Sequence, residues 1–355
     1  MSAVKKKVSF ILPSIGLGGA EKIFIELAGE INKNKNYEIE LVYLTKLQNE
    51  YTLPEGLVTV CLNSKSTKAA FIPLLRYFRS SKPDVVFSGI GHLNIMLIVI
   101  KSLFNFTFKL FVRHSNILSE SLPSDRHKQK LMLKLFRLYK KADKVIFQSQ
   151  SMQDDFLNLI KLNNSYIINN PININKNHEA SLAYNIDDSM RDTYLYVGRL
   201  SAVKQVDYLI NEYSKLTSER TPKLLIIGDG DQRNKLEEMI LERRLQDRVI
   251  LLGAISNPYP YIKECRAMFL CSKTEGFPNV VLEAFSFNKP MLIKKHRGGT
   301  KEILDSLNLR EFFLDRIDFN EIESLVSSFP KNIKERVIKR YDISSISLEY
   351  LDLIE

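Results

Sequence analysis

Apolar runs of strand length alternate with helical segments along this 355-residue chain. In the first half, we expect strands at residues 8–13, 39–44, 84–88, 109–112 and 144–148. In the second half, we expect them at residues 194–198, 223–228, 249–252, 268–271 and 290–293. Strands that alternate with helices form a parallel sheet with helices on both faces. The sequence therefore predicts an α/β protein.

The chain is too long for one small core and suits two domains of about 150 to 180 residues each. An Asn-Asn-Pro step at 169–171 favours a turn, so we expect residues 1–171 to form a first, Rossmann-like domain. The stretch 172–192 is rich in Asn and Asp and has little apolar periodicity, and we predict that it is a linker. Residues 193–340 are then expected to form the second domain.

Two glutamates lie eight positions apart in the stretch K-T-E-G-F-P-N-V-V-L-E-A-F-S-F, at Glu275 and Glu283. Gly276 and Pro278 predict a loop that opens a helix. The first turn of that helix, at residues 279–281, would offer backbone N–H groups to phosphate oxygens. Both carboxylates can then accept hydrogen bonds from hydroxyl groups on either side of a bound diphosphate, which is the layout of a nucleotide sugar. The alternative is an ordinary amphipathic helix whose glutamates face water.

The segment E-G-F-P-N-V-V-L-E-A resembles the E-x7-E motif of the retaining glycosyltransferases of family 4. The resemblance implies the GT-B fold, with two Rossmann-like domains facing each other across a cleft, and a final helix at 341–355 that returns to the first domain. It also implies that Glu275 faces the donor sugar and that Glu283 faces the ribose. Further donor contacts are then expected from Gly276, Phe277, Asn279, Val280 and Val281.

Arg199 and Lys204 lie in the segment R-L-S-A-V-K, just past an expected strand end. Together the two cations could neutralise the diphosphate leaving group as the sugar bond breaks. The segment resembles the family's G-R-L and K-G pattern, but Gln205 stands where the family has glycine. We therefore assign Arg199 and Lys204 to both catalysis and donor binding.

A glycine-rich turn, I-G-L-G-G-A-E-K, follows the first expected strand. Gly16, Gly18 and Gly19 can adopt positive φ and admit a ligand close to the backbone. The turn lacks the third spaced glycine of the dinucleotide fingerprint, so NAD binding would need a different loop. It resembles instead the N-terminal loop of family 4, which implies that Gly18 and Gly19 lie near the donor diphosphate.

Polar residues at the carboxyl ends of the first-domain strands are candidates for the cleft. These candidates are Gly89, His92, Arg113, His114 and Asn116. The family resemblance implies an active-site histidine in this region, so His114 is expected to be catalytic. The alternative is a structural histidine at a strand end.

Two later segments allow more than one interpretation. Asp229 and Asp231 form a D-G-D that could bind a divalent metal, but we favour capping of the following helix. The segment K-K-H-R-G-G-T-K departs from the family's D-x-x-G-G-P pattern, because Thr300 replaces proline and basic residues precede the glycines. Donor or acceptor preference is expected to differ there.

Positive charge is concentrated in the first half of the chain. The net charge is +10, made up of +11 for residues 1–175 (24 Lys and Arg against 13 Asp and Glu) and −1 for the remainder (27 against 28). Two basic amphipathic segments, at 65–82 and 126–144, can lie on an anionic membrane surface. The second carries a stripe of four basic residues, Lys130, Lys134, Arg137 and Lys141. Alternatively, both segments are crossover helices with solvated lysines.

Three cysteines without metal-ligand spacing, and no signal peptide or spanning segment, lead us to expect a cytoplasmic protein attached peripherally to the inner face of the membrane. We expect a retaining transferase that moves a hexose or N-acetylhexosamine from a nucleotide diphosphate sugar, by resemblance UDP, to a lipid-linked or polysaccharide acceptor. No metal or other cofactor is expected. The alternatives are a basic nucleic-acid-binding protein, for which no sequence signature is present, and an inactive GT-B partner protein.

Overall fold

The computed structural model describes residues 5–16, 18–47, 51–216 and 221–355. Residues 1–4 of the N-terminal segment and Leu17 of the glycine-rich turn lie outside this part. The chain divides into two compact units. The first consists of Met1–Pro171 together with Ile343–Glu355, and the second of Ile172–Asp342. Within the described residues, no helix combines the length and apolar character that crossing a bilayer requires.

The first unit contains a seven-stranded sheet in the order β3-β2-β1-β4-β5-β6-β7, in which all neighbouring strands are parallel. The strands are β1 (Lys6–Leu12), β2 (Tyr37–Tyr43), β3 (Val58–Cys61), β4 (Val85–Ser88), β5 (Lys109–Arg113), β6 (Lys144–Phe147) and β7 (Ser165–Ile167). The five expected strands are confirmed. The strands β3 and β7 were not expected, because they lie at the sheet's edges, are short and bury none of their residues.

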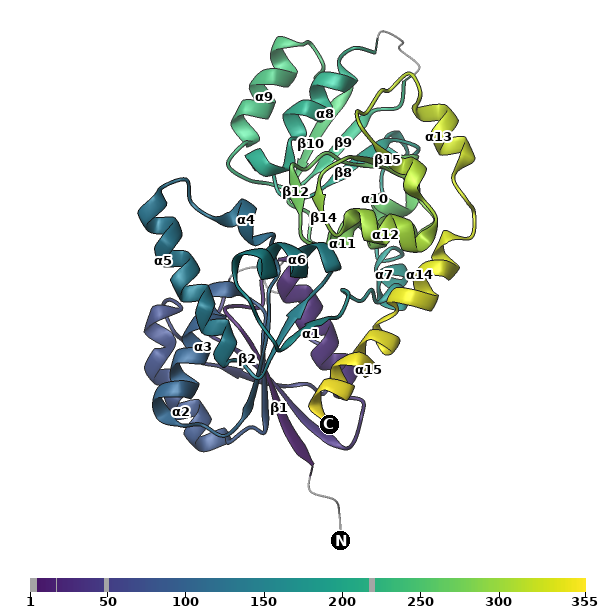
Figure 1. Ribbon diagram of the computed structural model, residues 1–355. Coiled ribbons are helices and arrows are strands. Elements are labelled where there is room, and N and C mark those ends of the chain that lie inside the picture. The colour runs from purple at the N-terminus through teal and green to yellow at the C-terminus, as the bar shows by residue number, and fades with distance from the viewer. Residues whose placement is uncertain (1–4, 17, 48–50, 217–220) are drawn as a thin grey trace. The chain divides into compact units, whose positions relative to one another are not determined.

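Helices connect these strands and cover the sheet. They are α1 (Gly19–Ile31), α2 (Phe71–Ser81), α3 (Gly91–Phe104), α4 (Leu118–Ser121), α5 (Arg126–Phe136) and α6 (Gln150–Leu159). The C-terminal helix α15 (Ile343–Ile354) belongs to the same unit and packs beside α1 (Figure 1). The ammonium groups of Lys6 and Lys144 donate to the last carbonyls of α15, where the helix dipole is negative.

Arg113, an expected cleft residue, is instead buried in the first unit with 2% of its surface exposed. Its guanidinium donates to the side chain of Asn170 and lies 5.5 Å from the ring centroid of Phe24 in α1. Burial lowers its pKa, and the neighbouring Tyr350 of α15 opposes that shift. Arg113 therefore holds β5, α1 and the C-terminal helix together. An exposed role in ligand binding does not fit this packing.

His114, the residue after β5, lies among four aromatic rings with only 4% of its surface exposed. The ring centroids of Phe136, Tyr139, Phe147 and Phe156 lie 5.0 to 5.9 Å from that of the imidazole. Its Nε2 atom is buried without a hydrogen-bond partner. Burial lowers the pKa of His114 to about 4. These surroundings favour the structural alternative that the sequence left open.

The second unit contains a six-stranded parallel sheet in the order β10-β9-β8-β11-β13-β15 (Figure 1). Its strands are β8 (Tyr194–Val197), β9 (Leu224–Ile227), β10 (Val249–Gly253), β11 (Ala267–Leu270), β13 (Met291–Lys294) and β15 (Phe313–Leu314). A separate pair joins β12 (Thr274–Glu275) and β14 (Arg297–Gly298). The helices are α7 (Ile174–Ala180), α8 (Val206–Tyr213), α9 (Arg233–Glu242), α10 (Tyr259–Glu264), α11 (Asn279–Ser286), α12 (Thr300–Leu307), α13 (Ile322–Ser328) and α14 (Ile333–Tyr341).

The stretch 172–192, expected to be a linker, is part of the second unit and contains α7. Asn173 caps this helix by accepting a hydrogen bond from the Lys176 N–H. Ile174 and Asn177 are buried, and the Asn257 side chain donates to the last carbonyl of α7 at 2.7 Å. The linker prediction differs from the structure because this short helix is packed by tertiary contacts, and its few apolar residues give no periodic pattern.

Burial of a neutral His114 predicts that the protein loses stability in acid. The unfolded chain binds a proton near pH 6.5, whereas folded His114 binds one only near pH 4. Stability should therefore fall as the pH drops through this window, by about 3 kcal/mol for this group. Urea unfolding at pH 7 and pH 4.5 measures the effect, and His114→Leu should remove this part of the pH dependence.

His92, an exposed histidine of α3, supplies the matched control. Its ring lies in water, so His92→Leu should keep the wild-type dependence of stability on pH. If His114→Leu kept the full acid sensitivity, the burial of a neutral His114 would not be its cause.

Candidate active site

Lys204 and Glu275 meet where the strand order of the second sheet reverses. Strands β8 and β11 are neighbours there, although β9 and β10 lie between them in the chain. Ligands of open α/β sheets bind at the carboxyl ends of strands at such a point. The Lys204 ammonium, after β8, lies 2.5 Å from Glu275 Oε1, after β11. The side chains retain 27% and 11% exposure, so the ion pair is shielded yet reachable.

Two further hydrogen bonds fix the segment that carries Glu275. The Ser272 hydroxyl donates to the Glu275 carboxylate, and the Lys273 N–H donates to the Val203 carbonyl at 2.8 Å. The loops after β8 and β11 are thus joined through both side chains and backbone. From the sequence, Lys204 was expected just past a strand end and Glu275 on a loop before a helix, and the structure brings the two side chains into contact.

Glu275 lies in strand β12, whereas the sequence predicted a loop. This short strand pairs with β14, which places Gly298 opposite Glu275. Gly298 adopts a φ of +120°, and a Cβ atom there would lie 1.6 Å from the Glu275 carbonyl oxygen. The Gly299 N–H also donates to the Gly276 carbonyl at 2.8 Å. The two glycines of H-R-G-G therefore support Glu275, and only glycine fits at position 298.

His296 closes the connection between β13 and α12. Its Nδ1 lies 2.8 Å from the Lys294 carbonyl oxygen, and its Nε2 lies 2.7 Å from the Thr300 hydroxyl. A carbonyl oxygen only accepts, so Nδ1 carries the proton and the Thr300 hydroxyl donates to Nε2. Burial lowers the pKa of His296, which favours this neutral ring. The sequence pattern drew attention to Thr300 in place of proline, whereas His296 was not expected to have a role.

The D-G-D segment supports the Arg199 loop and does not cap α9. Gly228 has a φ of +144°, and a Cβ there would lie 1.9 Å from the Gly198 carbonyl oxygen. The Leu200 N–H donates to the Asp229 carbonyl at 2.9 Å. The N-cap of α9 is Gln232, without a side-chain capping bond, while the carboxylates of Asp229 and Asp231 accept bonds from the residues that follow them. The capping prediction was wrong.

Arg199 itself is exposed, and its backbone carbonyl accepts a bond from the Tyr196 hydroxyl at 3.3 Å. Its guanidinium can therefore meet a ligand without first leaving a buried site. Across the described residues, no group of three or more His, Cys, Asp or Glu side chains is arranged to hold a metal ion.

Glu283 lies one turn inside α11 and accepts a hydrogen bond from the Tyr259 hydroxyl at 3.1 Å. Tyr259, from α10, is 8% exposed and was not identified from the sequence. Phe277 and Val281, expected to contact the donor, are buried, and the Phe277 ring packs 6.1 Å from that of Tyr341. Their side chains belong to the core, so only their backbones can contribute to a site.

Gly276, Asn279 and Val280 are partly exposed around the start of α11. In the first unit, Gly18 is the N-cap of α1 with a φ of −71°, and Gly19 is the exposed first residue of that helix. A Cβ at Gly18 would lie 2.2 Å from the Glu21 carboxylate. The Glu21 carboxylate ends a flexible side chain that can move, so neither space nor a positive φ requires glycine at position 18.

Residues 183–338 match the sequence family described as "Glycosyl transferases group 1". An uncharacterized glycosyltransferase of Methanocaldococcus jannaschii is 32% identical over 69% of this chain and 63% of its own length, so the match spans less than two thirds of that protein. A Campylobacter jejuni enzyme named N-acetylgalactosamine-N,N'-diacetylbacillosaminyl-diphospho-undecaprenol 4-alpha-N-acetylgalactosaminyltransferase is 24% identical over 84% of this chain and 83% of its own.

Among solved structures, that of Anabaena Alr3699/HepE in complex with UDP and glucose has a TM-score of 0.77. It is 17% identical in sequence, and the likeness covers 98% of this chain and 99% of the other. The two parallel, Rossmann-like sheets and this likeness show that the chain has the GT-B fold. The family match, the curated relatives and the fold together support a glycosyltransferase of the GT-B class.

Proposed function

We propose that this protein is a retaining glycosyltransferase that moves a hexose or N-acetylhexosamine from a UDP-sugar to a lipid-linked or polysaccharide acceptor, in cell-surface glycan biosynthesis. The observation that carries the proposal is the contact between Lys204 and Glu275 at the reversal of strand order. The structure of the Anabaena protein is a complex with UDP and glucose. The Campylobacter enzyme is named for an acceptor linked to diphospho-undecaprenol. These two similar proteins agree with the donor and acceptor chemistry proposed here.

In the proposed site, each of four side chains has a role in the reaction. Breaking the bond between the anomeric carbon and the phosphate oxygen leaves negative charge on the departing diphosphate. In this proposal, Arg199 and Lys204 neutralise that charge, together with the first turn of α11. Glu275 then orders the sugar hydroxyls, and Glu283 binds the ribose hydroxyls. The acceptor oxygen bonds to the anomeric carbon on the face that the diphosphate leaves, and the hydroxyl proton passes to the departing phosphate oxygen. The anomeric configuration is therefore retained.

Replacing each of the two glutamates with glutamine should change different kinetic parameters. A group that touches only the nucleotide binds ground and transition states alike, whereas a group that orders the sugar acts on the chemical step. Glu283→Gln should therefore raise KM and weaken UDP binding about tenfold. Glu275→Gln should mainly lower kcat, by about 100-fold, because Glu275 orders the sugar as charge develops in the chemical step.

Calorimetry with UDP and initial rates of UDP release from UDP-glucose, UDP-galactose and their N-acetyl forms measure both effects. Glu242→Gln, which changes an exposed glutamate of α9, should leave both parameters at wild-type values. The assignment is reversed if Glu275→Gln loses UDP affinity while Glu283→Gln retains it.

Catalysis should not depend on a divalent metal, because Arg199, Lys204 and the start of α11 already supply positive charge to the phosphates. Dialysis against EDTA is expected to leave kcat unchanged, and Asp231→Asn should keep the wild-type rate. A loss of activity that Mg²⁺ or Mn²⁺ restores would instead make ligands of Asp229 and Asp231.

The first unit is proposed to dock on the anionic inner face of the cytoplasmic membrane. Helix α2 buries Leu74, Leu75, Tyr77 and Phe78, as a crossover helix does. Helix α5 is different, since it buries only Phe136 and leaves Leu131 59% and Leu135 40% exposed. Exposed lysines flank these leucines. The combination of exposed apolar and basic side chains favours a lipid surface over a solvated crossover helix.

Sedimentation with liposomes tests this docking. Binding should be stronger to vesicles that contain phosphatidylglycerol than to phosphatidylcholine alone, and it should fall with added salt. Replacing Lys130, Lys134, Arg137 and Lys141 with Gln should abolish most of the difference. A control with Gln at four exposed basic residues of the second unit, Lys215, Lys235, Lys301 and Arg310, should bind like wild type. Equal binding to both kinds of vesicle would exclude the proposal.

A further inference from the structure

Gln205, the residue after Lys204, has the left-handed backbone conformation, with φ 50° and ψ 44°. Glycine adopts this conformation readily, whereas a residue with a Cβ is held there by its surroundings. Gln205 is also the N-cap of α8, but its side chain makes no capping hydrogen bond. The side-chain amide of Gln205 therefore makes its hydrogen bond with a group outside α8.

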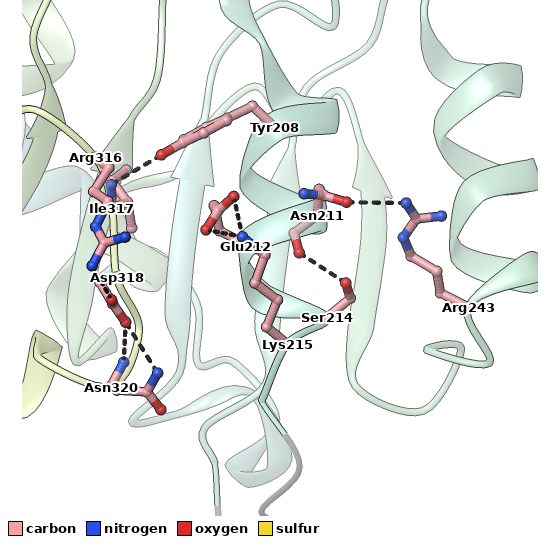
Figure 2. A network of polar contacts seen from close by, with 10 residues as sticks. All are labelled: Tyr208, Asn211, Glu212, Ser214, Lys215, Arg243, Arg316, Ile317, Asp318 and Asn320. Carbon is pink, nitrogen blue, oxygen red and sulfur yellow. Dashed lines mark hydrogen bonds and ion pairs between the residues drawn. The ribbon is translucent and has the colours of Figure 1, made fainter.

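The Gln205 side chain accepts a hydrogen bond from the Lys294 ammonium at 3.1 Å. The same ammonium lies 4.4 Å from the ring centroid of Tyr208, which favours a cation through its π face. Tyr208 is fixed in turn, because its hydroxyl accepts a bond from the Ile317 N–H at 3.0 Å, as Figure 2 shows. Lys294 is thus held between an amide oxygen and an aromatic ring.

These contacts connect, for a second time, the two segments that the Lys204–Glu275 ion pair joins. Lys294 ends β13, and three residues later the chain forms β14, which pairs with the strand of Glu275. Glu275 contacts Lys204, and Gln205 follows Lys204 directly. The hydrogen bond between Lys294 and Gln205 therefore ties the Lys204 loop to the segment that supports Glu275. We call this hydrogen bond the second tie.

We propose that Gln205 and Lys294 are positioning residues that hold the Lys204 ammonium in its catalytic place. This inference rests on the proposed function. A lysine side chain has several rotatable bonds, and a catalytic cation stabilises developing charge only when its position is fixed beforehand. The ion pair restrains the tip of Lys204, while the second tie restrains its backbone. Neither Gln205 nor Lys294 needs to touch the substrate for this effect.

Kinetics of three variants test the second tie. Gln205→Gly and Lys294→Met should each lower kcat for UDP release about tenfold while changing KM less than twofold, because positioning acts on the chemical step. The double variant should be no slower than the slower single variant, since both changes remove one contact. Gln205→Glu keeps an acceptor for Lys294 and should restore most of the rate. The control, Lys235→Met, breaks only the exposed pair with Asp207 and should keep the wild-type kcat.

Melting temperature separates positioning from simple destabilisation. Gln205→Gly relieves the left-handed backbone, so its melting temperature should equal or exceed that of wild type although its kcat falls. A wild-type kcat in Gln205→Gly, or rate losses that multiply in the double variant, would overturn the proposal.

Hydrogen exchange provides a readout that needs no substrate. Amides of residues 200–206 should exchange faster in Lys294→Met than in wild type or Lys235→Met. If wild type released UDP from none of the four UDP-sugars, that result would count against the proposed function alone. Unchanged exchange at residues 200–206 in Lys294→Met would overturn the second tie itself.

Discussion

The candidate site at the carboxyl ends of β8 and β11 depends on the ion pair between Lys204 and Glu275. A partly buried charge is costly unless it is paired, so each side chain keeps the other in place. The pair can form only because β8 and β11 are neighbours in the sheet. Two glycines allow close backbone approaches in the segments that carry the site residues. Gly298 must approach the Glu275 carbonyl, and Gly228 must approach the loop that carries Arg199.

The two units use polar side chains in contrasting ways. In the first unit, Arg113 and His114 are buried and hold elements of the core together. In the second unit, Arg199, Lys204 and Glu275 gather at the carboxyl edge of the sheet and keep some exposure. Burial thus distinguishes structural from candidate catalytic groups, even though all of them follow strands in the sequence.

The sequence predicted the α/β class and most strands, because each apolar run carries its own local signal. Edge strands such as β3 and β7 have no such signal, since pairing alone defines them. Lys204 and Glu275 could each be identified as a candidate from sequence. Their contact could not, because it requires the strand order of the folded sheet.

The incorrect predictions have the same origin. The D-G-D segment was interpreted through its neighbours in sequence, whereas its role is to pack against a loop some thirty residues earlier. Gln205 appeared only as a departure from glycine, because its partner Lys294 is distant in the chain. Tyr259 and His296 were missed for the same reason. Local motifs therefore identified the residue types of the site, and non-local packing determined their roles.

The most direct test of the central claim is a double-mutant cycle between Lys204 and Glu275, with kcat for UDP release as the readout. If the pair acts as one catalytic unit, Lys204→Met and Glu275→Gln should each cause a large loss, and the double variant should be no slower than the slower single variant. Independent losses that multiply in the double variant would contradict the account, because they would mean that the two side chains contribute separately.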